Sequence, residues 1–309
     1  MKTIIIAFVT LISLNAFSQE KKVCITVDDL PTVTYRSLDK ELNVEITQKL
    51  VAIFDQYKIP AIGYVNEKKL YHGNLLDPSQ VKLLELWLEN GYELGNHTFS
   101  HLNYHQVPFE TFTKDLLKGE KITKELAAKY DLEYKYFRHP YLRSGERKGQ
   151  SDSLKHFLAE HGYTEAPVTI DNEDYLFAKA YGLAHLRGDS VQMKQIGEAY
   201  LKYMEEKLFF YEKLSNDLLG RNIQHILLVH ASLLNADYLG KLAAIYQKNG
   251  YTFVSQTEVL TDPAYLSEVT RFGDWGISWI DRWALSQGKK GNFFKGDPIT
   301  PGFIQELSK

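Results

Sequence analysis

The sequence predicts an α/β fold built from parallel strands, because short apolar runs alternate with amphipathic helical stretches along most of its 309 residues. The apolar runs are rich in Val, Ile, Tyr and Phe and lie at 23–27, 61–65, 92–95, 134–138, 166–170, 225–230 and 252–254. The helical patterns between them lie at 41–57, 79–90, 108–130, 151–161, 189–219 and 235–249. Such alternation is typical of parallel βαβ units in an open sheet or a barrel, and seven strands slightly favour a barrel.

Several of these helices have recognisable ends. Pro78-Ser79 opens the helix that ends at Asn90-Gly91, and Asn235 is expected to cap the helix that runs to Asn249-Gly250. After about residue 258 the alternation stops, and a helix around 275–286 is followed by a tail punctuated by Gly and Pro. We therefore expect an α/β domain over residues 22–258, either an open sheet or a barrel, and a C-terminal extension over residues 259–309 that packs on it.

Residues 1–18 have the features of a signal peptide. Lys2 supplies the positive start, and the apolar stretch from Ile4 to Leu14 is too short to span a bilayer. Ala16-Phe17-Ser18 resembles a small-x-small cleavage site, and no later segment of the sequence is long and apolar enough to cross a membrane. We therefore expect an exported protein that acts in the periplasm or outside the cell.

The composition argues against some classes of function. A net charge of −3 gives no signature of polyanion binding, so nucleic acid is not an expected partner. Cys24 is the only cysteine, and its apolar neighbours indicate a small buried side chain and not a nucleophile. The 20 Tyr and 16 Phe suit a sugar-facing surface, but they suit an ordinary core equally well.

Polar residues gather directly after the predicted strands, whose carboxyl ends meet at one mouth in a parallel α/β fold. The first of them, Asp28-Asp29, follows the apolar run 23–27. Two adjacent carboxylates repel each other and resist desolvation there, so folding alone gives little reason for them. A divalent metal would hold one carboxylate as a ligand and leave the other free to act as a base.

His97 and His101 are four residues apart, a spacing that points both imidazoles the same way if the segment forms one helical turn. His105 extends the spacing by four more residues, so a polar helix face is the alternative interpretation. Together with Asp29, the pair forms a set of two histidines and one carboxylate. Such a set suffices for a catalytic Zn²⁺ with open positions for water and substrate.

Arg138 and Tyr141 follow the strand expected at 134–138. Arg138 could pair with Asp28 and keep it ionised, although a salt bridge with only a structural role explains the residue equally well. Tyr141 could line a sugar groove, because an aromatic ring beside a polar mouth is a suitable platform.

The acidic segment at 171–175 and a histidine at 230 complete the polar set. The segment is either an acidic loop or a calcium site, but it lacks the glycine and the distal glutamate of an EF-hand. His230 emerges at the end of the strand expected at 225–230, where it is well placed as a general acid unless it is a core histidine. His225, at the other end of that strand, is expected in the core.

Together these segments resemble the polysaccharide deacetylase family, also known as the NodB homology domain or carbohydrate esterase family 4. Five motifs occur in the family's order over roughly residues 22–258. They are Thr26-Val27-Asp28-Asp29, His97-Thr98-Phe99-Ser100-His101, Arg138-His139-Pro140-Tyr141, Asp171-x-x-Asp174-Tyr175 and Leu228-Val229-His230. Each motif is short, but the ordered set is specific. The resemblance implies a distorted (β/α)7 barrel.

The resemblance also implies a metal-dependent hydrolase that removes acetyl groups from a polysaccharide or oligosaccharide. N-acetyl amino sugars are the favoured substrates, and an O-acetyl ester such as acetylated xylan is the alternative. The implied metal ligands are Asp29, His97 and His101, with zinc favoured and cobalt or nickel also compatible. A monomer whose partner is an acetylated glycan is expected.

The same resemblance implies a role for each remaining motif residue. Asp28 would be the general base, steadied by Arg138. His230 would be the general acid, oriented by Asp174. The residues implied to contact substrate are Tyr141 and Tyr175 beside the groove, with the Tyr141 N–H near the oxyanion, and Leu228 in the acetate pocket.

Three positions depart from the family's usual pattern. Leu30 and Leu142 stand where glycine is usual, and Tyr175 stands in place of Trp. Side chains at the two glycine positions are expected to narrow the groove or reshape its loops, which leaves open a glycan-binding barrel without catalysis. Beyond the motifs, three tryptophans recur every four residues, and we expect them to pack on the barrel and not to form a sugar platform: Trp275, Trp279 and Trp283.

Overall fold

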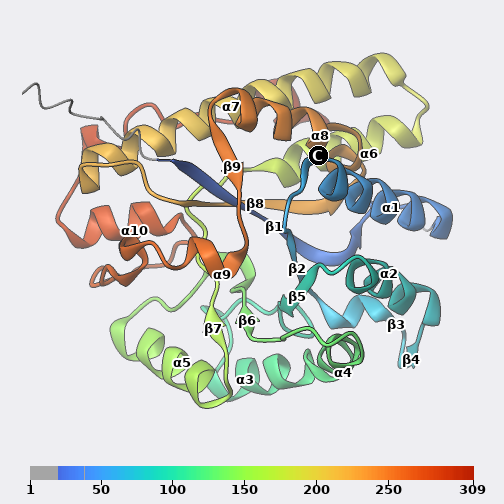
Figure 1. Ribbon diagram of the computed structural model, residues 1–309, viewed down its shortest axis with the longest axis horizontal. Helices are drawn as coiled ribbons and strands as arrows, with labels where there is room; N and C mark the ends of the chain where they lie inside the picture. The colour runs from blue at the N-terminus through green and yellow to red at the C-terminus, as the bar shows by residue number, and fades with distance from the viewer. Residues whose placement is uncertain (1–19, 38) are drawn as a thin grey trace, which may run out of the picture.

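The computed structural model describes residues 20–37 and 39–309, so the predicted signal peptide at 1–18 lies outside the described residues. Its main sheet has the spatial order β7-β6-β5-β2-β1-β8, with β9 paired to β1 and every pairing parallel (Figure 1). The strands are β1 (Lys21–Val33), β2 (Ile62–Val65), β5 (Glu93–Asn96), β6 (Tyr136–Phe137), β7 (Thr164–Glu165), β8 (His225–Ser232) and β9 (Tyr251–Phe253). A small antiparallel hairpin consists of β3 (Tyr71–His72) and β4 (Leu75–Leu76).

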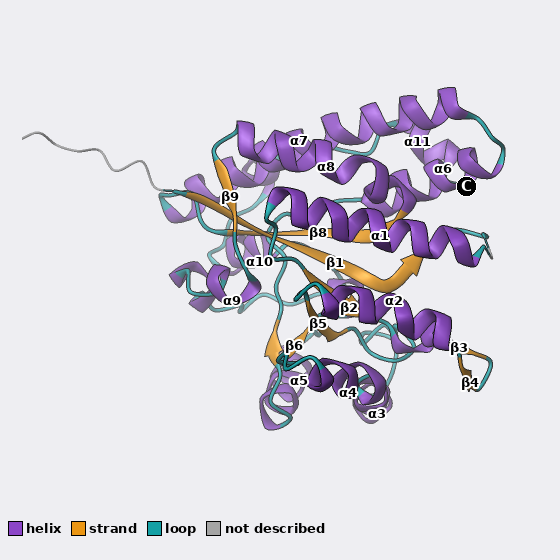
Figure 2. Ribbon diagram, turned by 45° about the vertical axis from the view of Figure 1, so that its right-hand side comes forward, coloured by secondary structure: helices purple, strands orange, loops and turns teal. Residues whose placement is uncertain are grey.

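Helices surround these strands, as the alternating sequence pattern predicted. Figures 1 and 2 show α6, α7 and α8 on one side of the strands and α3, α4 and α5 on the opposite side. The longer helices are α1 (Lys40–Tyr57), α2 (Pro78–Glu89), α3 (Phe109–Lys118), α4 (Lys121–Lys129), α5 (Lys148–Glu160), α6 (Asp174–Leu186), α7 (Ser190–Leu219), α8 (Leu233–Lys248) and α10 (Trp279–Ser286). The short ones are α9 (Gln256–Val259) and α11 (Gly302–Leu307), with 3-10 turns that include η1 (Glu67–Leu70) and η2 (Pro140–Leu142).

The sheet curls into a barrel because the chain after β7 joins its two outer edges. The Ala166 N–H donates to the carbonyl of Phe137 in β6, and the Ile170 N–H donates to the carbonyl of Ile226 in β8. Ile170 also forms an isolated parallel bridge with Leu227. The predicted strand at 166–170 is therefore wrong in its bounds, but the segment fills the gap between the edges. The predicted α/β fold, a distorted (β/α)7 barrel, is confirmed.

Three helix predictions need correction. The helix expected at 108–130 is two helices, separated at Gly119, where an added Cβ would lie 2.4 Å from the backbone of the 97–101 segment. Helix α6 was not predicted at all, because its buried apolar residues follow one another without a clear amphipathic period. Helix α8 is capped by Ser232, whose Oγ accepts the N–H of Asn235, so Asn235 lies inside the first turn and is not the cap.

The C-terminal extension contacts the segment that completes the barrel. The Trp279 N–H donates to the carbonyl of Val168 (2.7 Å), and the Ser278 hydroxyl donates to the carbonyl of Thr169 (2.9 Å). Trp279 and Trp283 are buried, whereas Trp275 precedes α10 and is half-buried. The predicted helix at 275–286 thus begins four residues later than expected, and two of its three tryptophans pack inward.

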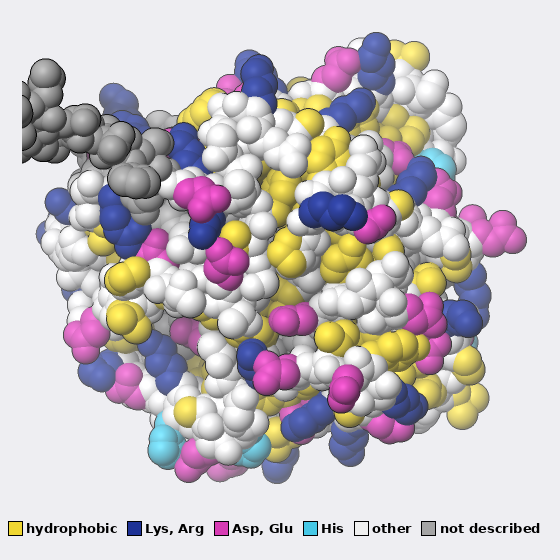
Figure 3. Space-filling view, viewed as in Figure 1, with side chains coloured by type: hydrophobic (Ala, Val, Ile, Leu, Met, Phe, Trp, Pro, Cys, Tyr) yellow, Lys and Arg dark blue, Asp and Glu magenta, His cyan; other side chains and the backbone are white. Residues whose placement is uncertain are grey.

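No helix among the described residues is long and apolar enough to cross a membrane. On the face shown in Figure 3, basic and acidic side chains are mixed, and neither sign of charge occupies a continuous surface.

Candidate active site

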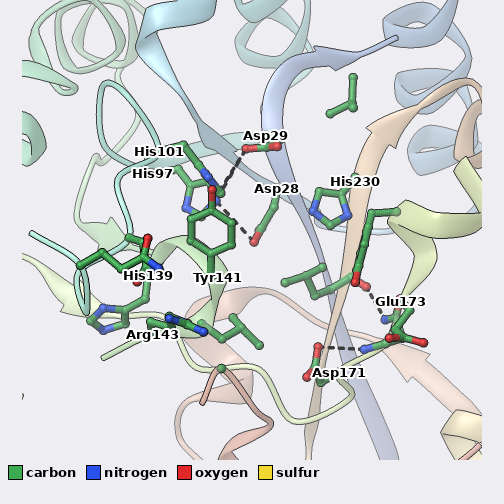
Figure 4. Close-up of a pocket in the computed structure, with 18 of the residues that line it drawn as sticks. Asp28, Asp29, His97, His101, His139, Tyr141, Arg143, Asp171, Glu173 and His230 are labelled. Carbon is green, nitrogen blue, oxygen red and sulfur yellow. Dashed lines mark hydrogen bonds and ion pairs between the residues drawn. The ribbon is translucent and has the colours of Figure 1, made fainter. Parts of the chain in front are cut away.

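A pocket of about 860 Å³ opens where the carboxyl ends of the parallel strands meet. Asp28 and Asp29 reach it from β1, and His230 and Leu228 reach it from β8. Figure 4 shows Asp28 between the imidazoles of His97 and His101 on one side and that of His230 on the other. The other predicted site residues that line the pocket are Tyr141 and Tyr175, whereas Arg138 and Asp174 lie behind its wall.

The three predicted metal ligands lie together. Each of Asp29, His97 and His101 offers one ligand atom, and these atoms all lie within 4.8 Å of one another. The Oδ1 of Asp29 is 3.8 Å from the Nε2 of His97 and 3.6 Å from the Nε2 of His101. The three residues thus lie together as predicted, and their role as metal ligands stays a prediction.

The reason that we gave for the histidine spacing is wrong, because residues 97–101 do not form a helical turn. Instead the chain makes a tight loop with Thr98 at φ 64° and His101 at φ 55°. Side chains fix the loop: the Oδ1 of Asn96 accepts the Thr98 N–H (2.7 Å), and the Oγ1 of Thr98 accepts the His101 N–H (3.0 Å). Asp29 is also left-handed, at φ 67°. Such backbone strain is common at ligand sites.

The chemistry of this cluster fits a divalent cation. Among the described residues, no hydrogen-bond partner reaches the buried Oδ1 of Asp29. The Nδ1 of His97 lies 2.8 Å from the carbonyl of Arg138, so Nδ1 carries the proton and Nε2 faces Asp29 as a lone pair. Burial lowers the pKa of His97 to about 4, and burial together with the neighbouring His97 lowers that of His101 to about 4. Both rings are therefore in the neutral form that binds metals.

Asp28 is almost completely buried and lies next to this cluster, with its Oδ2 3.9 Å from the Nε2 of His97. The Nη1 of Arg138 is also 3.9 Å from that oxygen, which is the outer limit of an ion pair. Burial raises the pKa of Asp28, and the charge of Arg138 only partly offsets the effect. Arg138 therefore favours the ionised form, as predicted, but its direct hydrogen bond goes elsewhere, to the Oγ1 of Thr26 (2.9 Å).

His230 is held by a buried carboxylate on the opposite side of Asp28. The Nδ1 of His230 lies 2.6 Å from the Oδ1 of Asp174, which leaves Nε2 free on the other side of the ring. Burial opposes protonation of His230, but the charge and hydrogen bond of Asp174 outweigh it and raise the pKa to about 9. His230 is therefore an imidazolium at neutral pH, which suits a proton donor. By contrast, His225 is buried with its pKa lowered to about 3, as expected of a core histidine.

Of the two leucines at glycine positions, only one reaches the pocket. Leu30 is fully buried against Gly63, where an added Cβ would lie 2.0 Å from the Leu30 Cδ1. The expectation that Leu30 narrows the groove is thus wrong, because its side chain fills the space left by Gly63. Leu142 does line the pocket, and its φ of 53° is a conformation that glycine adopts more readily.

Sequence reasoning missed two residues that hold the site. The Nζ of Lys69 donates to the Asp29 carbonyl (2.7 Å) and lies 3.5 Å from the Asp29 carboxylate. The amide of Asn235 donates to the Oδ2 of Asp174 (2.9 Å) and to the carbonyl of His230 (2.8 Å). Only the position of these residues in the fold identifies them, since no motif that we recognised contains either one.

A second group of ligand-type atoms comprises His105, Glu146 and Asp274. Here the Nε2 of His105 accepts the Gly145 N–H (3.0 Å), so Nδ1 carries the ring proton and points at the Oδ1 of Asp274 (3.2 Å). Arg143 also lies 2.8 Å from that oxygen. The protonated Nδ1 of His105 and the guanidinium of Arg143 lie beside Asp274, where a bound cation would otherwise lie. This group therefore connects the extension to the barrel.

The fold and the pocket define an α/β barrel with a candidate metal-binding site beside an Asp-His pair. Residues 17–166 match the family model described as polysaccharide deacetylase. The resemblance predicted from the motifs is thus confirmed, and this segment, which holds the first three motifs, carries the signature of the polysaccharide deacetylase family. No curated protein matches the chain significantly.

Solved structures share this fold. The peptidoglycan deacetylase PdaC from Bacillus subtilis is 15% identical, with a TM-score of 0.50 over 79% of this chain and 91% of that chain. A CE4 family pseudoenzyme from Bacillus anthracis is 13% identical, with a TM-score of 0.50 over 78% of this chain and 66% of that chain. A mutant of that pseudoenzyme with restored activity is 14% identical, with a TM-score of 0.51 over 78% and 68%. At these identities the likeness concerns the fold.

Proposed function

We propose that this protein is a divalent-metal-dependent hydrolase that removes acetyl groups from an acetylated glycan. The observation that carries the proposal is the arrangement around Asp28. This buried carboxylate lies between the cluster of Asp29, His97 and His101, which we call the metal-type cluster, and a histidine that is protonated at neutral pH. The pairing of a base with an acid across one pocket is the arrangement that hydrolysis of an acyl bond requires.

Each residue has a defined task in this proposal. Asp29, His97 and His101 would hold the cation, with zinc favoured and cobalt or nickel compatible. When bound, such a cation supplies Lewis acidity and a water of lowered pKa. Asp28 takes the proton of the attacking water, and His230, held by Asp174, gives its proton to the leaving group.

The residues around the acetyl group would bind and orient it. Leu228 is nearly buried in the pocket floor and offers an apolar surface for the methyl group. Tyr141 and Tyr175 are about half exposed on the rim, where their rings can contact sugar. The Tyr141 amide would donate to the oxyanion, an interaction that is stronger in the transition state than in the substrate.

An N-acetyl group is the favoured substrate, because of what each leaving group needs. An amine cannot leave an amide without receiving a proton, whereas an alkoxide leaves an ester with much less help. His230, which keeps its proton to about pH 9, matches the more demanding case. The likeness in fold to a peptidoglycan deacetylase agrees with this choice, and acetylated xylan remains the alternative substrate.

We also propose that the chain is exported through the signal peptide at 1–18 and acts as a monomer in the periplasm or outside the cell. The apolar stretch from Ile4 to Leu14 and the cleavage-type sequence before Gln19 support export. N-terminal sequencing of the protein recovered from the native host tests this part. A protein that retains Met1 would contradict it.

The test of activity is acetate release from acetylated chitooligosaccharides, peptidoglycan and acetylated xylan, with and without a chelator. We expect release from N-acetyl substrates, loss of release with chelator, and recovery on adding Zn²⁺. Asp28→Asn and His230→Ala should each abolish release with the fold intact, whereas the exposed controls Asp152→Asn and His156→Ala should not. Glycan binding without release in the zinc-loaded wild type would instead identify a non-catalytic barrel.

A further inference from the structure

We propose that residues 274–282 of the C-terminal extension are a positioning element for the turn that carries the Tyr141 amide. They lie outside the matched family segment, which ends at residue 166. The inference rests on the proposed function, because the turn matters for catalysis only if Tyr141 acts on the oxyanion.

The turn is strained in a way that calls for external support. Tyr141 and Leu142 both have left-handed backbones, at φ 58° and φ 53°. Consecutive left-handed residues with side chains are uncommon, because the Cβ crowds the backbone in that conformation. A turn of this kind relaxes unless neighbouring groups hold it.

The extension contacts this turn at three successive residues. Asp274 pairs with Arg143 (2.8 Å), which follows the turn directly. Gly276 lies so close to the Tyr141 carbonyl that an added Cβ would be 1.8 Å from its oxygen. The Nη2 of Arg282 donates to the Leu142 carbonyl (2.7 Å). Every residue from 141 to 143 is thus held by the same short stretch of chain.

Arg282 is the centre of this arrangement. Its side chain is buried, and the guanidinium also donates to the carbonyls of Ile277 (3.3 Å) and Trp275 (3.4 Å). The carbon at the centre of the guanidinium lies 5.0 Å from the Trp279 ring centre. A rigid fork that binds carbonyls from two segments at once fixes their relative position, which the flexible point charge of a lysine does less well.

The turn at residues 141–143 also contacts the metal-type cluster. The Tyr141 ring lies edge-on to the His101 ring, with 4.5 Å between the ring centres. A shift of the turn would therefore move both the amide and the ring that covers His101. Since a displacement of about 1 Å at a reacting centre can lower a rate by about 10²-fold, a brace of this kind is expected to affect kcat.

Two substitutions test whether residues 274–282 hold the turn, which we call the brace, and a third serves as a control. Arg282→Met removes the donor to Leu142, and Gly276→Ala pushes on the Tyr141 carbonyl. Ser308→Ala removes a hydrogen bond of a buried serine elsewhere in the extension, from its hydroxyl to the Gln305 carbonyl, and lies outside residues 274–282. We expect kcat to fall about 10- to 100-fold in the first two variants, with KM and Zn²⁺ affinity within about twofold of wild type. Ser308→Ala should keep wild-type kcat, and Arg282→Lys should recover part of the loss of Arg282→Met.

Two kinetic results would overturn the inference in an active wild type. One is a kcat within twofold of wild type in both Arg282→Met and Gly276→Ala. The other is an equal loss in Ser308→Ala, which would point to general destabilisation. A crystal structure of Gly276→Ala gives an independent readout, because we expect Tyr141 to leave the left-handed region. An unchanged turn would contradict the brace even if the wild type released no acetate, an outcome that concerns the proposed function alone.

Discussion

Asp174 binds His230 through both oxygens of one carboxylate. Its Oδ1 lies 2.6 Å from the Nδ1 of His230, and its Oδ2 accepts the His230 backbone N–H (2.8 Å). The amide of Asn235 donates to the same Oδ2. Asp174 is fully buried at the start of α6, so its charge is satisfied by these bonds and by the imidazolium. The ring orientation, its tautomer and its protonation are therefore set by one side chain.

Replacing Asp174 with asparagine should therefore remove the acid without removing the histidine. We expect Asp174→Asn to lower kcat by about 10²- to 10⁴-fold, because an amide does not stabilise the imidazolium and can hold the neutral ring in the wrong tautomer. NMR titration should show the His230 pKa falling clearly below about 9, since only the charges of Asp29 and Asp28 then oppose the effect of burial. A variant with the wild-type pKa would show that another group holds the proton.

The pH dependence of kcat/KM follows from the same two groups. Activity requires Asp28 ionised and His230 protonated. Burial raises the pKa of Asp28 and a bound cation opposes that rise, so the acidic limb should lie at or below the pKa that Asp28 has in the metal-free protein. The basic limb should lie at or below pH 9, because a bound cation disfavours a second positive charge on His230. The profile should be bell-shaped, and Asp174→Asn should move the basic limb to lower pH. A basic limb unchanged by Asp174→Asn would contradict the assignment of His230.

The sequence predicted which residues meet at the pocket, because each motif follows a strand and parallel strands bring those ends together, whereas the roles of these residues stay predictions. The parallel pairing of β1 with β8 places Asp28 opposite His230. This agrees with the sequence, in which each of the two residues directly follows the apolar part of its strand. The histidine pair was predicted from a helical spacing, yet a strained loop brings the rings together. The loop fits because Gly119 lets α3 and α4 approach its backbone. The missing side chain of Gly119 makes room for a loop about 20 residues earlier in the chain. No local sequence pattern reveals such a contact.

The sequence did not identify the residues that support the site for a related reason. Lys69 contacts a residue 40 positions away, and Arg282 contacts one 140 positions away. Neither lies in a motif that we recognised, and a lone Lys or Arg is ordinarily read as surface charge. Helix α6 was missed because its buried residues include Phe177, Ala178, Ala180 and Tyr181, which give no polar face to detect.

Lys69 should contribute to metal affinity through Asp29. Its ammonium holds the carbonyl of Asp29, whose left-handed backbone otherwise has reason to relax. We expect Lys69→Gln to weaken Zn²⁺ binding about 10-fold, the scale of effects from groups that support a ligand. Isothermal titration calorimetry measures this directly, and Lys68→Gln on the same 3-10 turn is the exposed control. Equal affinity in wild type and Lys69→Gln would exclude the role.

The tryptophans of the extension should differ in their contributions to stability. Trp283 is 1% exposed, and its ring lies 5.7 Å from that of Tyr265. Trp283→Ala should therefore reduce the free energy of unfolding by about 3–5 kcal/mol, the usual loss for a buried Trp. Trp275→Ala, at a half-buried position outside α10, should cost clearly less. Chemical denaturation measures both, and equal losses would contradict the packing that we describe.

Asp281, in the first turn of α10, should make the stability of the folded protein fall as the pH rises. Burial, reinforced by the charge of Asp171, raises the pKa of Asp281 to about 7 from an ordinary value of 3.8. The folded state thus binds this proton more tightly than the unfolded state. Its contribution is fully present below about pH 4 and is lost as the pH approaches 7.

Asp281→Asn should remove this dependence, because an amide stays neutral throughout. At pH 8 we expect the variant to melt several °C higher than wild type, because the rise in the pKa of Asp281 from 3.8 to about 7 corresponds to roughly 4 kcal/mol. At pH 4 the difference should be small, since Asp281 is then protonated in the folded state and about half protonated in the unfolded state of the wild type. Melting curves between pH 4 and 8 measure the effect, with the exposed Asp152→Asn as control. A difference that does not change with pH would mean that Asp281 is ionised in the folded protein throughout this range.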